Sequence, residues 1–344
     1  MAETVKILLY GLGYIGSSIA KLILEKKGLQ VVGAVDIADD KIGKDVGEVL
    51  GLETRLGIRV SRHLPEALRD QKAEVAIHAT SSRITETEPQ IFELTKAGLH
   101  IISTCEELAY PFYRHKDFAR SIDQEARNRG VTILGTGINP GFVLDFLILS
   151  LSSVCQKIQR IAATRVVDAS LRRPALQTKI GAGLTEQQFQ EGVIKGTIGH
   201  VGLTDSVAMI ADGLGVELDS ITETIEPKLP DRNLQTDDTK IAKDQVAGVH
   251  QVGFGWLAGE SFITLILEIY VGAKDPLDSV LIEGVPYVHF NMRGGIPGDQ
   301  ATAAIVVNSI PKVMKAKPGL VTVKDLPPAS LILGDFAALS RNAS

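Results

Sequence analysis

The first 141 residues alternate strand-like and helical segments, and this alternation constrains the fold more than any other feature of the chain. Short β-branched runs typical of buried strands occur at Val5 to Tyr10, Val31 to Val35, Val75 to Ala79, His100 to Ser103 and Val131 to Leu134. Between them, apolar residues recur at helical spacing over Ile15 to Lys27, Leu64 to Gln71, Glu88 to Ala97 and Phe118 to Arg129. Because parallel strands are joined by helical crossovers, the alternation predicts α/β structure, a Rossmann-like doubly wound parallel sheet.

The pattern changes after Gly141, where longer β-rich runs begin. These runs lie at Ile158 to Val167, Gln251 to Gly259, Ser261 to Val271 and Val280 to Met292, with a tight turn expected at Gly259-Glu260. A helical stretch interrupts them. It opens at Thr185, with Gln188 three residues later as a capping box, and continues toward Leu214. This mixture predicts an α+β domain with an open, largely antiparallel sheet.

The chain has 344 residues, more than the roughly 250 at which single cores usually stop growing. We therefore place a dinucleotide-binding domain at 1–141 and an α+β domain at 142–298. The remainder, 299–344, opens with an Ala-rich helix from Asp299 to about Lys315 and ends in a tail. Within the second domain, the polar segment Glu226 to Val246 is expected to form a surface excursion or a lid.

Charge and composition exclude several classes of protein. Lys and Arg total 36 against 41 Asp and Glu, a net charge of -5 without a basic block, so we expect no nucleic-acid partner. The longest apolar stretches contain acids such as Asp145 and Glu268 and are shorter than the roughly 20 residues of a membrane span. Two cysteines are too few for a disulfide framework or a metal site, and the start lacks the pattern of a signal peptide. We expect a cytoplasmic protein without a metal.

A glycine motif predicts where a dinucleotide binds. It reads Gly11-Leu12-Gly13-Tyr14-Ile15-Gly16, directly after the first strand and at the start of the first helix. Gly11 permits the tight turn, Gly13 lets the backbone approach a pyrophosphate, and Gly16 lets the helix pack on the strand. The first helical turn, with Tyr14 and Ile15, then faces the phosphates with its N–H groups.

The next strands supply candidates for the ribose groups. Asp36 lies 20 residues after Gly16, where a carboxylate accepts the adenosine ribose hydroxyls and favours NAD. Lys41 and Lys44 follow closely, and their positive charges can neutralise the 2'-phosphate of NADP. The cofactor is therefore NAD or NADP. Thr80 and Ser81 end the next strand-like segment, where they contact the nicotinamide ribose or cap the following helix.

Two adjacent acids follow the strand His100 to Ser103. Glu106 and Glu107 lie at the expected carboxyl edge of the sheet, beside the presumed cofactor. A carboxylate shielded from water there has the pKa that proton transfer near neutral pH requires. The alternative is that both acids stabilise the N-terminal turn of a helix. One of the two is a candidate general base.

Several blocks together resemble the 2,4-diaminopentanoate dehydrogenases and the related native amine dehydrogenases. They are Ser103-Thr104-Cys105-Glu106-Glu107-Leu108-Ala109-Tyr110-Pro111, Gly135-Thr136-Gly137-Ile138-Asn139-Pro140-Gly141-Phe142, Arg165-Val166-Val167-Asp168-Ala169-Ser170-Leu171-Arg172-Arg173 and Gly298-Asp299-Gln300-Ala301-Thr302-Ala303-Ala304. The resemblance covers nearly the whole chain. It implies NAD(P)-dependent oxidative deamination of a primary amine to a ketone and ammonia, reversible as reductive amination.

The resemblance also implies roles for particular residues. Glu106 matches the acid/base residue of the family better than Glu107 does. Asn139 is expected beside the nicotinamide, with Phe142 and Val143 lining the pocket. A homodimer through the second domain's sheet and a C-terminal helix that returns to the first domain are family expectations.

The substrate itself stays open between 2,4-diaminopentanoate and a simpler amine. Arg172, with Arg173, is either a clamp for a substrate carboxylate or a solvated surface pair, and Gln177 is a weak pocket candidate.

Two other functions are alternatives to the amine dehydrogenase. A reductase of the dihydrodipicolinate reductase type shares the N-terminal pattern, but its Pro-Ser-Gly-Thr run is absent here. The second alternative is a protein that senses NAD(P) without catalysis, but such a protein does not need an acid such as Glu106 beside the cofactor.

Overall fold

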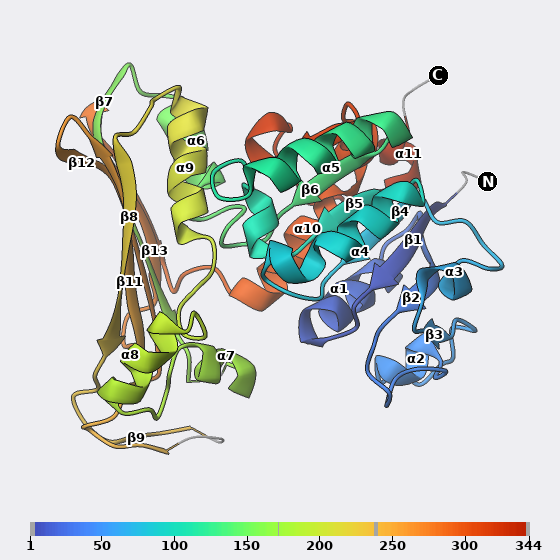
Figure 1. Cartoon of the computed structure of the whole chain (residues 1–344), viewed down its shortest axis with the longest axis horizontal. Helices are drawn as coiled ribbons and strands as arrows, with labels where there is room; N and C mark the ends of the chain where they lie inside the picture. Colours follow the sequence, from blue (N-terminus) through green and yellow to red (C-terminus); the bar gives the residue numbers. More distant parts are fainter. Residues whose placement is uncertain (1–3, 171, 237–239, 342–344) are drawn as a thin grey trace. The chain divides into compact units, whose positions relative to one another are not determined.

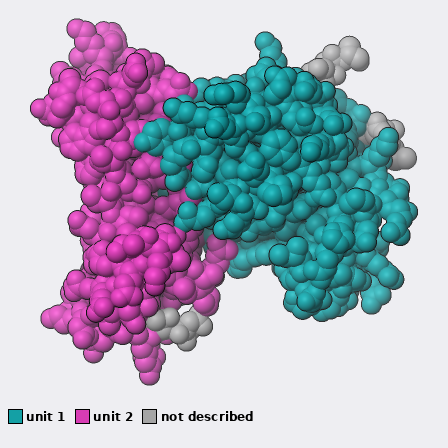
Figure 2. Space-filling view, in the orientation of Figure 1, with its two compact units in different colours: residues 1–141, 297–344 teal, residues 142–296 magenta. Residues whose placement is uncertain are grey.

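A computed structural model describes residues 4–170, 172–236 and 240–341. The chain divides into two compact units (Figures 1 and 2). Unit 1 contains residues 1–141 together with 297–344, and unit 2 contains residues 142–296. The two ends of the chain therefore belong to one unit, and the middle of the chain forms the other.

Unit 1 is built on a seven-stranded sheet in which every pairing is parallel, as predicted. Its order is β15-β6-β5-β4-β1-β2-β3. The strands are β1 (Val5–Tyr10), β2 (Leu29–Val35), β3 (Val60–Ser61), β4 (Val75–His78), β5 (His100–Ser103), β6 (Thr132–Gly135) and β15 (Gly319–Val321). The chain moves outward from β1 to β3 and then crosses back to β4. The carboxyl ends of β1 and β4 therefore flank a topological switch point, where ligands of such sheets bind.

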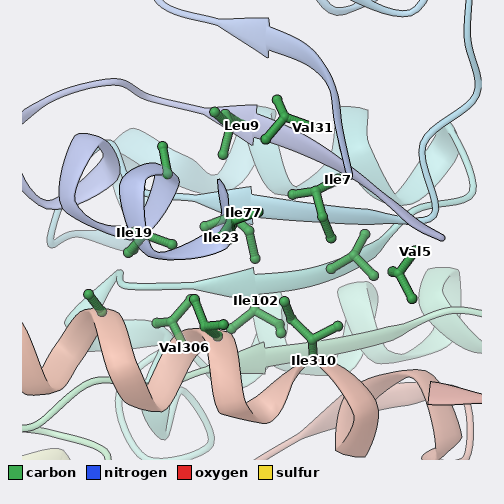
Figure 3. Packing of buried hydrophobic residues seen from close by; sticks show 14 of the residues in the cluster. Val5, Ile7, Leu9, Ile19, Ile23, Val31, Ile77, Ile102, Val306 and Ile310 are labelled. Carbon is green, nitrogen blue, oxygen red and sulfur yellow. The ribbon is translucent and has the colours of Figure 1, made fainter. Parts of the chain in front are cut away.

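Helices cover both faces of this sheet. The longer ones are α1 (Tyr14–Leu24), α4 (Ile84–Lys96), α5 (Lys116–Arg129) and α10 (Gly298–Lys315). Figure 3 shows one face, where Ile19 and Ile23 of α1 and Val306 and Ile310 of α10 pack on alternate residues of β1. Helices α4 and α5 pack on the opposite face through a second buried cluster. Because strand residues alternate between faces, the consecutive buried residues Ile7, Leu8 and Leu9 show that β1 is covered on both sides.

The shorter elements of unit 1 depart most from the sequence expectation. They are α2 (Val46–Val49), α3 (Leu64–Ala67), η1 (Glu106–Ala109), η2 (Val323–Asp325) and α11 (Phe336–Ser340). The helix expected over Leu64 to Gln71 ends at Ala67 with Leu68 as its C-cap, and the residues after Leu68, Arg69 to Gln71, are polar and exposed. Strand β3 was not predicted, since two residues give no recognisable period. In the described residues, no helix is long and apolar enough to cross a membrane.

Unit 2 contains a six-stranded sheet in the order β14-β13-β7-β12-β11-β8. Its strands are β7 (Lys157–Asp168), β8 (Ser220–Lys228), β11 (Gly248–Leu257), β12 (Glu260–Tyr270), β13 (Leu277–Val285) and β14 (Val288–Arg293). Strands β7 and β12 pair in parallel, and the other four pairings are antiparallel. The largely antiparallel sheet is confirmed. Figure 1 shows the helices of this unit on one side of the sheet.

Among its described residues, unit 2 contains four helices. They are α6 (Phe146–Ser152), α7 (Pro174–Lys179), α8 (Glu186–Ile194) and α9 (Leu203–Leu214). The helical stretch expected from Thr185 toward Leu214 is two of them, α8 and α9. The capping box of Thr185 and Gln188 is confirmed. The continuous helix expected toward Leu214 is wrong, because Gly196, Gly199 and Gly202 adopt φ values of 68°, 113° and 96° between α8 and α9. A right-handed helix cannot pass through such positions.

Three further details of unit 2 correct the sequence analysis. The tight turn lies at Ala258-Gly259, one residue earlier than expected, and both residues have positive φ, the geometry of a type I' hairpin. The run Val280 to Met292 is two strands, β13 and β14, paired as a hairpin. The Glu226 to Val246 excursion begins within β8 and contains the short hairpin β9 (Leu234–Gln235) and β10 (Lys240–Ile241). Residues 237–239 of the excursion lie outside the described residues.

Candidate active site

The glycine motif joins β1 to α1, as predicted. Gly11 has a φ of 93°, and a Cβ added to it would lie 2.4 Å from the carbonyl oxygen of Ala79, at the end of β4. A Cβ on Gly16 would lie 2.0 Å from the carbonyl oxygen of Gly11. Neither position admits a side chain, because in both cases the obstacle is backbone. The loop, the helix and β4 are therefore in backbone contact at the switch point.

Gly13 differs from these two glycines because a Cβ there would meet nothing within 4 Å. It is exposed and caps α1, and the first helical bond runs from the Ser17 amide to its carbonyl oxygen at 2.8 Å. Tyr14 begins the helix with 60% of its surface exposed, and Ile15 follows half-buried. The first-turn N–H groups of a helix point away from its body. An open glycine cradle at such a helix start fits a pyrophosphate.

Asp36 follows β2 and is bound to the glycine loop. Its carboxylate accepts hydrogen bonds from the Leu12 amide at 2.7 Å, the Ala38 amide at 2.9 Å and Lys41 Nζ at 3.0 Å. Burial raises the pKa of this carboxyl, but the bonds from Ala38, Leu12 and Lys41 outweigh it and hold the pKa below its usual value. Asp36 is therefore an anion at neutral pH, placed where a ribose is recognised.

Of the two lysines near Asp36, one lies at the ribose position. Lys41 Nζ also donates to the carbonyl oxygen of Leu12 at 3.0 Å, so it bridges Asp36 and the glycine loop. Lys44 instead lies 3.8 Å from Glu48 on α2. The carboxylate of Asp36 and the ammonium of Lys41 therefore lie together beside the glycine loop.

The hydroxyl groups after β4 contact the helix that follows them. Thr80 Oγ1 donates to Gln90 Oε1 at 2.7 Å, and Ser81 Oγ donates to Glu86. Both acceptors are on α4. These contacts correspond to the helix-capping alternative of the sequence analysis, although both residues still lie at the carboxyl edge of the sheet.

The side chain of Glu107 is buried in the protein interior. It is 3% exposed, and its carboxylate accepts the Ile84 amide at the start of α4 at 2.7 Å. Its oxygens also lie 3.5 Å from Arg114 Nη2 and 3.2 Å from His115 Nε2. Its own amide donates to the Ser82 carbonyl oxygen at 3.2 Å. Glu107 therefore fastens η1 to the start of α4.

Glu106 precedes it as the first residue of η1 and is partly exposed. Successive residues of this tight turn point in different directions. One acid is thus buried in structural contacts and the other reaches the accessible edge of the sheet. The geometry thus separates two carboxylates whose spacing alone left either one as the candidate base.

A buried polar chain lies beside this turn and was missed by the sequence analysis. His78, the last residue of β4, is 0% exposed. Its Nδ1 lies 2.8 Å from Ser103 Oγ and its Nε2 lies 2.7 Å from Gln90 Oε1. Ser103 Oγ also accepts the Cys105 amide at 3.1 Å. The available signal was a histidine ending an otherwise apolar strand.

Asn139 lies in the loop after β6, whose Thr136 amide donates to the Ser103 carbonyl oxygen at 2.9 Å. Both polar atoms of the Asn139 side chain are buried, and neither has a hydrogen-bond partner among the described residues. Buried amides are normally paired. A second carboxamide can pair with both atoms of the Asn139 side chain, because its oxygen accepts from Nδ2 and its NH2 group donates to Oδ1. The nicotinamide ring carries a carboxamide, so Asn139 fits the cofactor.

The remaining predicted residues belong to unit 2. Phe142 is half-buried with its ring 6.3 Å from that of Phe146, and Val143 is 1% exposed. Arg172 is half-buried, and Gln177 Nε2 donates to the carbonyl oxygens of Ala169 at 3.1 Å and Arg172 at 3.2 Å. Gln177 therefore holds the loop that carries Arg172.

Arg165 and Asp278 form a buried ion pair on neighbouring strands of unit 2. Arg165 Nη1 lies 2.7 Å from both Asp278 oxygens. Burial lowers the pKa of Arg165, Asp278 opposes this, and the positive charge of Arg172 adds to the lowering. Arg172 therefore brings a second positive charge close to this pair.

A parallel sheet with a glycine cradle, a ribose carboxylate and an accessible acid at its carboxyl edge defines an NAD(P)-dependent dehydrogenase. Comparisons with known proteins give the family. The 2,4-diaminopentanoate dehydrogenase C-terminal domain model matches residues 142–342, and the dihydrodipicolinate reductase N-terminus model matches residues 5–104. The chain belongs to the 2,4-diaminopentanoate dehydrogenase family. In sequence, the resemblance to the reductase is confined to this N-terminal part.

Two curated relatives and one solved structure support this family assignment. A 2,4-diaminopentanoate dehydrogenase of Acetoanaerobium sticklandii is 34% identical over 98% of this chain and 97% of its own length. An amine dehydrogenase of Streptomyces virginiae is 22% identical over 92% of this chain and 95% of its own. The amine dehydrogenase structure from Mycobacterium smegmatis has a TM-score of 0.86 at 25% identity, covering 95% of this chain and 97% of that one. The protein is an oxidoreductase acting on CH–NH2 groups, with NAD or NADP as its cofactor.

The contacts of the two acids predict unequal effects on stability. Glu107→Ala leaves the Ile84 amide and the neighbouring Arg114 and His115 without their buried partner, so we expect a loss of about 2–4 kcal/mol in the free energy of unfolding. Glu106→Ala is the matched control and should cost less than about 1 kcal/mol. Urea unfolding of the full chain, followed by circular dichroism, measures both. Equal losses would show that Glu107 is not the structural acid.

Proposed function

We propose that this protein catalyses the oxidative deamination of 2,4-diaminopentanoate, or of a simpler primary amine, to the ketone and ammonia, reversible as reductive amination. The observation that carries the proposal is the separation of the two acids. Glu107 is bound to α4, while Glu106 stays accessible at the carboxyl edge of a dinucleotide-binding sheet. The name of the 34% identical relative supports the diamine as substrate.

The reaction needs a base at two points. The amine enters as an ammonium and must lose a proton, which Glu106 accepts, before its carbon can give up a hydride. When bound, the nicotinamide accepts that hydride, leaving an iminium on the substrate. Glu106 releases the ammonium proton to solvent and takes another from water as the oxygen attacks the iminium carbon. It then returns that proton to the nitrogen, and ammonia leaves as the carbinolamine loses its hydroxyl proton and becomes the ketone. The balance is amine plus NAD(P)+ plus water to ketone plus ammonia plus NAD(P)H and a proton.

Charge and orientation serve this chemistry. The negative carboxylate of Glu106 stabilises the iminium cation. Asn139 would hold the nicotinamide carboxamide through its two buried, unpartnered side-chain atoms. Phe142 and Val143 supply the apolar wall that limits water.

The substrate carboxylate has a candidate partner in Arg172. Arg165 is paired with Asp278, and Arg172 lies on the loop that Gln177 holds. A guanidinium pairs with a carboxylate through two parallel hydrogen bonds. This arrangement favours an amino acid over a plain alkylamine.

The proposal also covers the cellular compartment and the binding partners of the protein. The two cysteines are free, and burial raises the pKa of Cys105 to about 12, so it is an unreactive thiol. Free thiols suit a reducing compartment, and we place the protein in the cytoplasm. Its partners are the amine, the ketone and ammonia.

An initial-rate assay tests the reaction. Purified protein is supplied with 2,4-diaminopentanoate or a simple alkylamine, each with NAD and with NADP, and the reduced nicotinamide is followed by absorbance. Turnover of the diamine at a kcat/KM at least about tenfold above that of the alkylamine is expected, because only the diamine carries the carboxylate. Turnover of the alkylamine alone would assign the simpler amine and remove the clamp role of Arg172.

The same assay includes Glu106→Ala as its control. This variant should lose at least about a hundredfold in kcat while its NAD(P) dissociation constant changes little. Near-normal turnover would remove Glu106 from the mechanism.

The Asp36–Lys41 pair predicts the effect of an acid substitution on cofactor choice. Asp36→Ala removes the acceptor of the ribose hydroxyls and releases Lys41 to pair with a 2'-phosphate. Binding of NAD should weaken by about tenfold, and that of NADP should weaken less or improve. Fluorescence titration of each cofactor measures the ratio. An equal loss for both would show that Asp36 does not discriminate at the ribose.

A second copy of the chain is proposed to cover the outer face of the unit 2 sheet. That face carries half-buried apolar side chains in its central strands, among them Val166, Phe254 and Ile266. Its edges carry opposite charge, with Arg293 on β14 and Glu226 on β8. A two-fold axis along the strands places each edge over the opposite edge of the other copy.

Light scattering after gel filtration tests this assembly. The native chain should elute as a dimer, and Val166→Lys should give a monomer because it places a charge at the centre of the apolar face. Ile194→Lys, at an 86% exposed position on α8, is the control and should remain dimeric. A monomeric native chain would contradict the proposal.

A further inference from the structure

His78 is the only residue of β4 that can form side-chain hydrogen bonds, and it lies fully buried next to the switch point. Strand β4 pairs with β1 on one side and β5 on the other, so the imidazole lies within the central strands. Burial of a polar ring is unfavourable unless its nitrogens are paired. Both nitrogens are paired here, and the direction of those hydrogen bonds can be deduced.

Gln90 Oε1 accepts hydrogen bonds only, and it lies 2.7 Å from His78 Nε2. The proton of the ring is therefore on Nε2. Burial lowers the pKa of His78 to about 4, so the ring is neutral at physiological pH and Nδ1 is a bare acceptor. Nδ1 takes the hydroxyl proton of Ser103 at 2.8 Å. The hydroxyl oxygen of Ser103 is then free to accept the Cys105 amide at 3.1 Å.

These bonds form a directed chain from α4 to the residue before Glu106, and Thr80 Oγ1, which donates to Gln90 Oε1, also lies 3.0 Å from His78 Nε2. Gln90 fixes the imidazole, the imidazole fixes the Ser103 hydroxyl, and that hydroxyl holds the Cys105 amide. On the other side of Glu106, the Glu107 amide is bound to Ser82 and its carboxylate to the Ile84 amide. Glu106 therefore lies between two residues that are each anchored to the β4–α4 segment.

We propose that His78 is a positioning residue of the reaction: its Nδ1, acting through Ser103, fixes the turn that presents Glu106 to the substrate. The inference rests on the proposed role of Glu106. In this proposal the hydrogen bond accepted by Nδ1 is the one that positions Glu106. The hydrogen bond donated by Nε2 only orients the ring. A ring that merely filled space in the core would show no such difference between its two nitrogens.

Two amide substitutions separate the two halves of the ring. In His78→Asn the side-chain oxygen reaches the position of Nδ1 and can accept from Ser103. In His78→Gln the longer side chain places its amide near Nε2 and restores only the bond to Gln90. We expect His78→Asn to keep kcat within about threefold of the native value and His78→Gln to lower kcat by at least about tenfold, because small misplacements of a reacting group are costly. KM for the amine and cofactor affinity should change less than about threefold in both.

Two further variants complete the design. Ser103→Ala removes the next bond of the chain and leaves His78 in place, so it should reproduce the kcat loss of His78→Gln even if a His78 variant does not fold. His100 is a second histidine of the same sheet, half-buried at the amino end of β5, where its Nδ1 accepts the Thr132 amide at 3.1 Å. His100→Gln is the matched control for a histidine lost from this sheet, and it should leave kcat unchanged.

A readout independent of turnover is the hydrogen exchange of the peptide spanning residues 103–109 in the protein without substrate. Exchange should be faster in His78→Gln and Ser103→Ala and near native in His78→Asn. Equal kcat and equal exchange in the Asn and Gln variants, with Glu106→Ala inactive, would overturn the positioning role and leave the proposed function intact. Full activity of Glu106→Ala would overturn the proposed function, and the exchange result would then decide only whether the chain of bonds holds the turn.

Discussion

The backbone contact between the glycine loop and the end of β4 is the constraint on which the rest of unit 1 depends. A single added methyl group at Gly11 would lie 2.4 Å from the Ala79 carbonyl oxygen, so the contact is set by the main chain and not by adjustable side chains. It brings the start of α1 against the two strands that flank the switch point. The cradle for a pyrophosphate and the polar groups that end β4 are therefore parts of one rigid arrangement.

The elements that could be predicted from the sequence are those whose pattern is local. Strands β1 and β5 were located to the residue because each apolar run has clear boundaries. The break between α8 and α9 was not seen, because glycine at helical spacing signals a weak helix rather than a stop, and only the positive φ values reveal it. The hairpin of β13 and β14 was read as one run, since its turn carries no glycine pair.

The site shows the same division between local and tertiary information. The glycine motif and Asp36 were found because their spacing is part of a local unit, a strand, a loop and a helix. The different positions of Glu106 and Glu107 were not available from sequence, because both acids occupy the same turn and the deciding partner is an amide 23 residues earlier in the chain. Lys41 was one of two lysines near Asp36, and only the folded loop shows which of them is its ion-pair partner.

The choice of a neutral imidazole beside the Glu106 turn has an electrostatic reason. The turn must be held rigidly, and the strongest hydrogen bonds available would come from a charged group. A buried ammonium or carboxylate at the His78 position would, however, act on the proton affinity of any acid nearby and on the cation that forms in the substrate. A neutral ring that donates through one nitrogen and accepts through the other orients two neighbours and adds no net charge. Rigidity and a suitable electrostatic environment are thereby obtained from the same side chain.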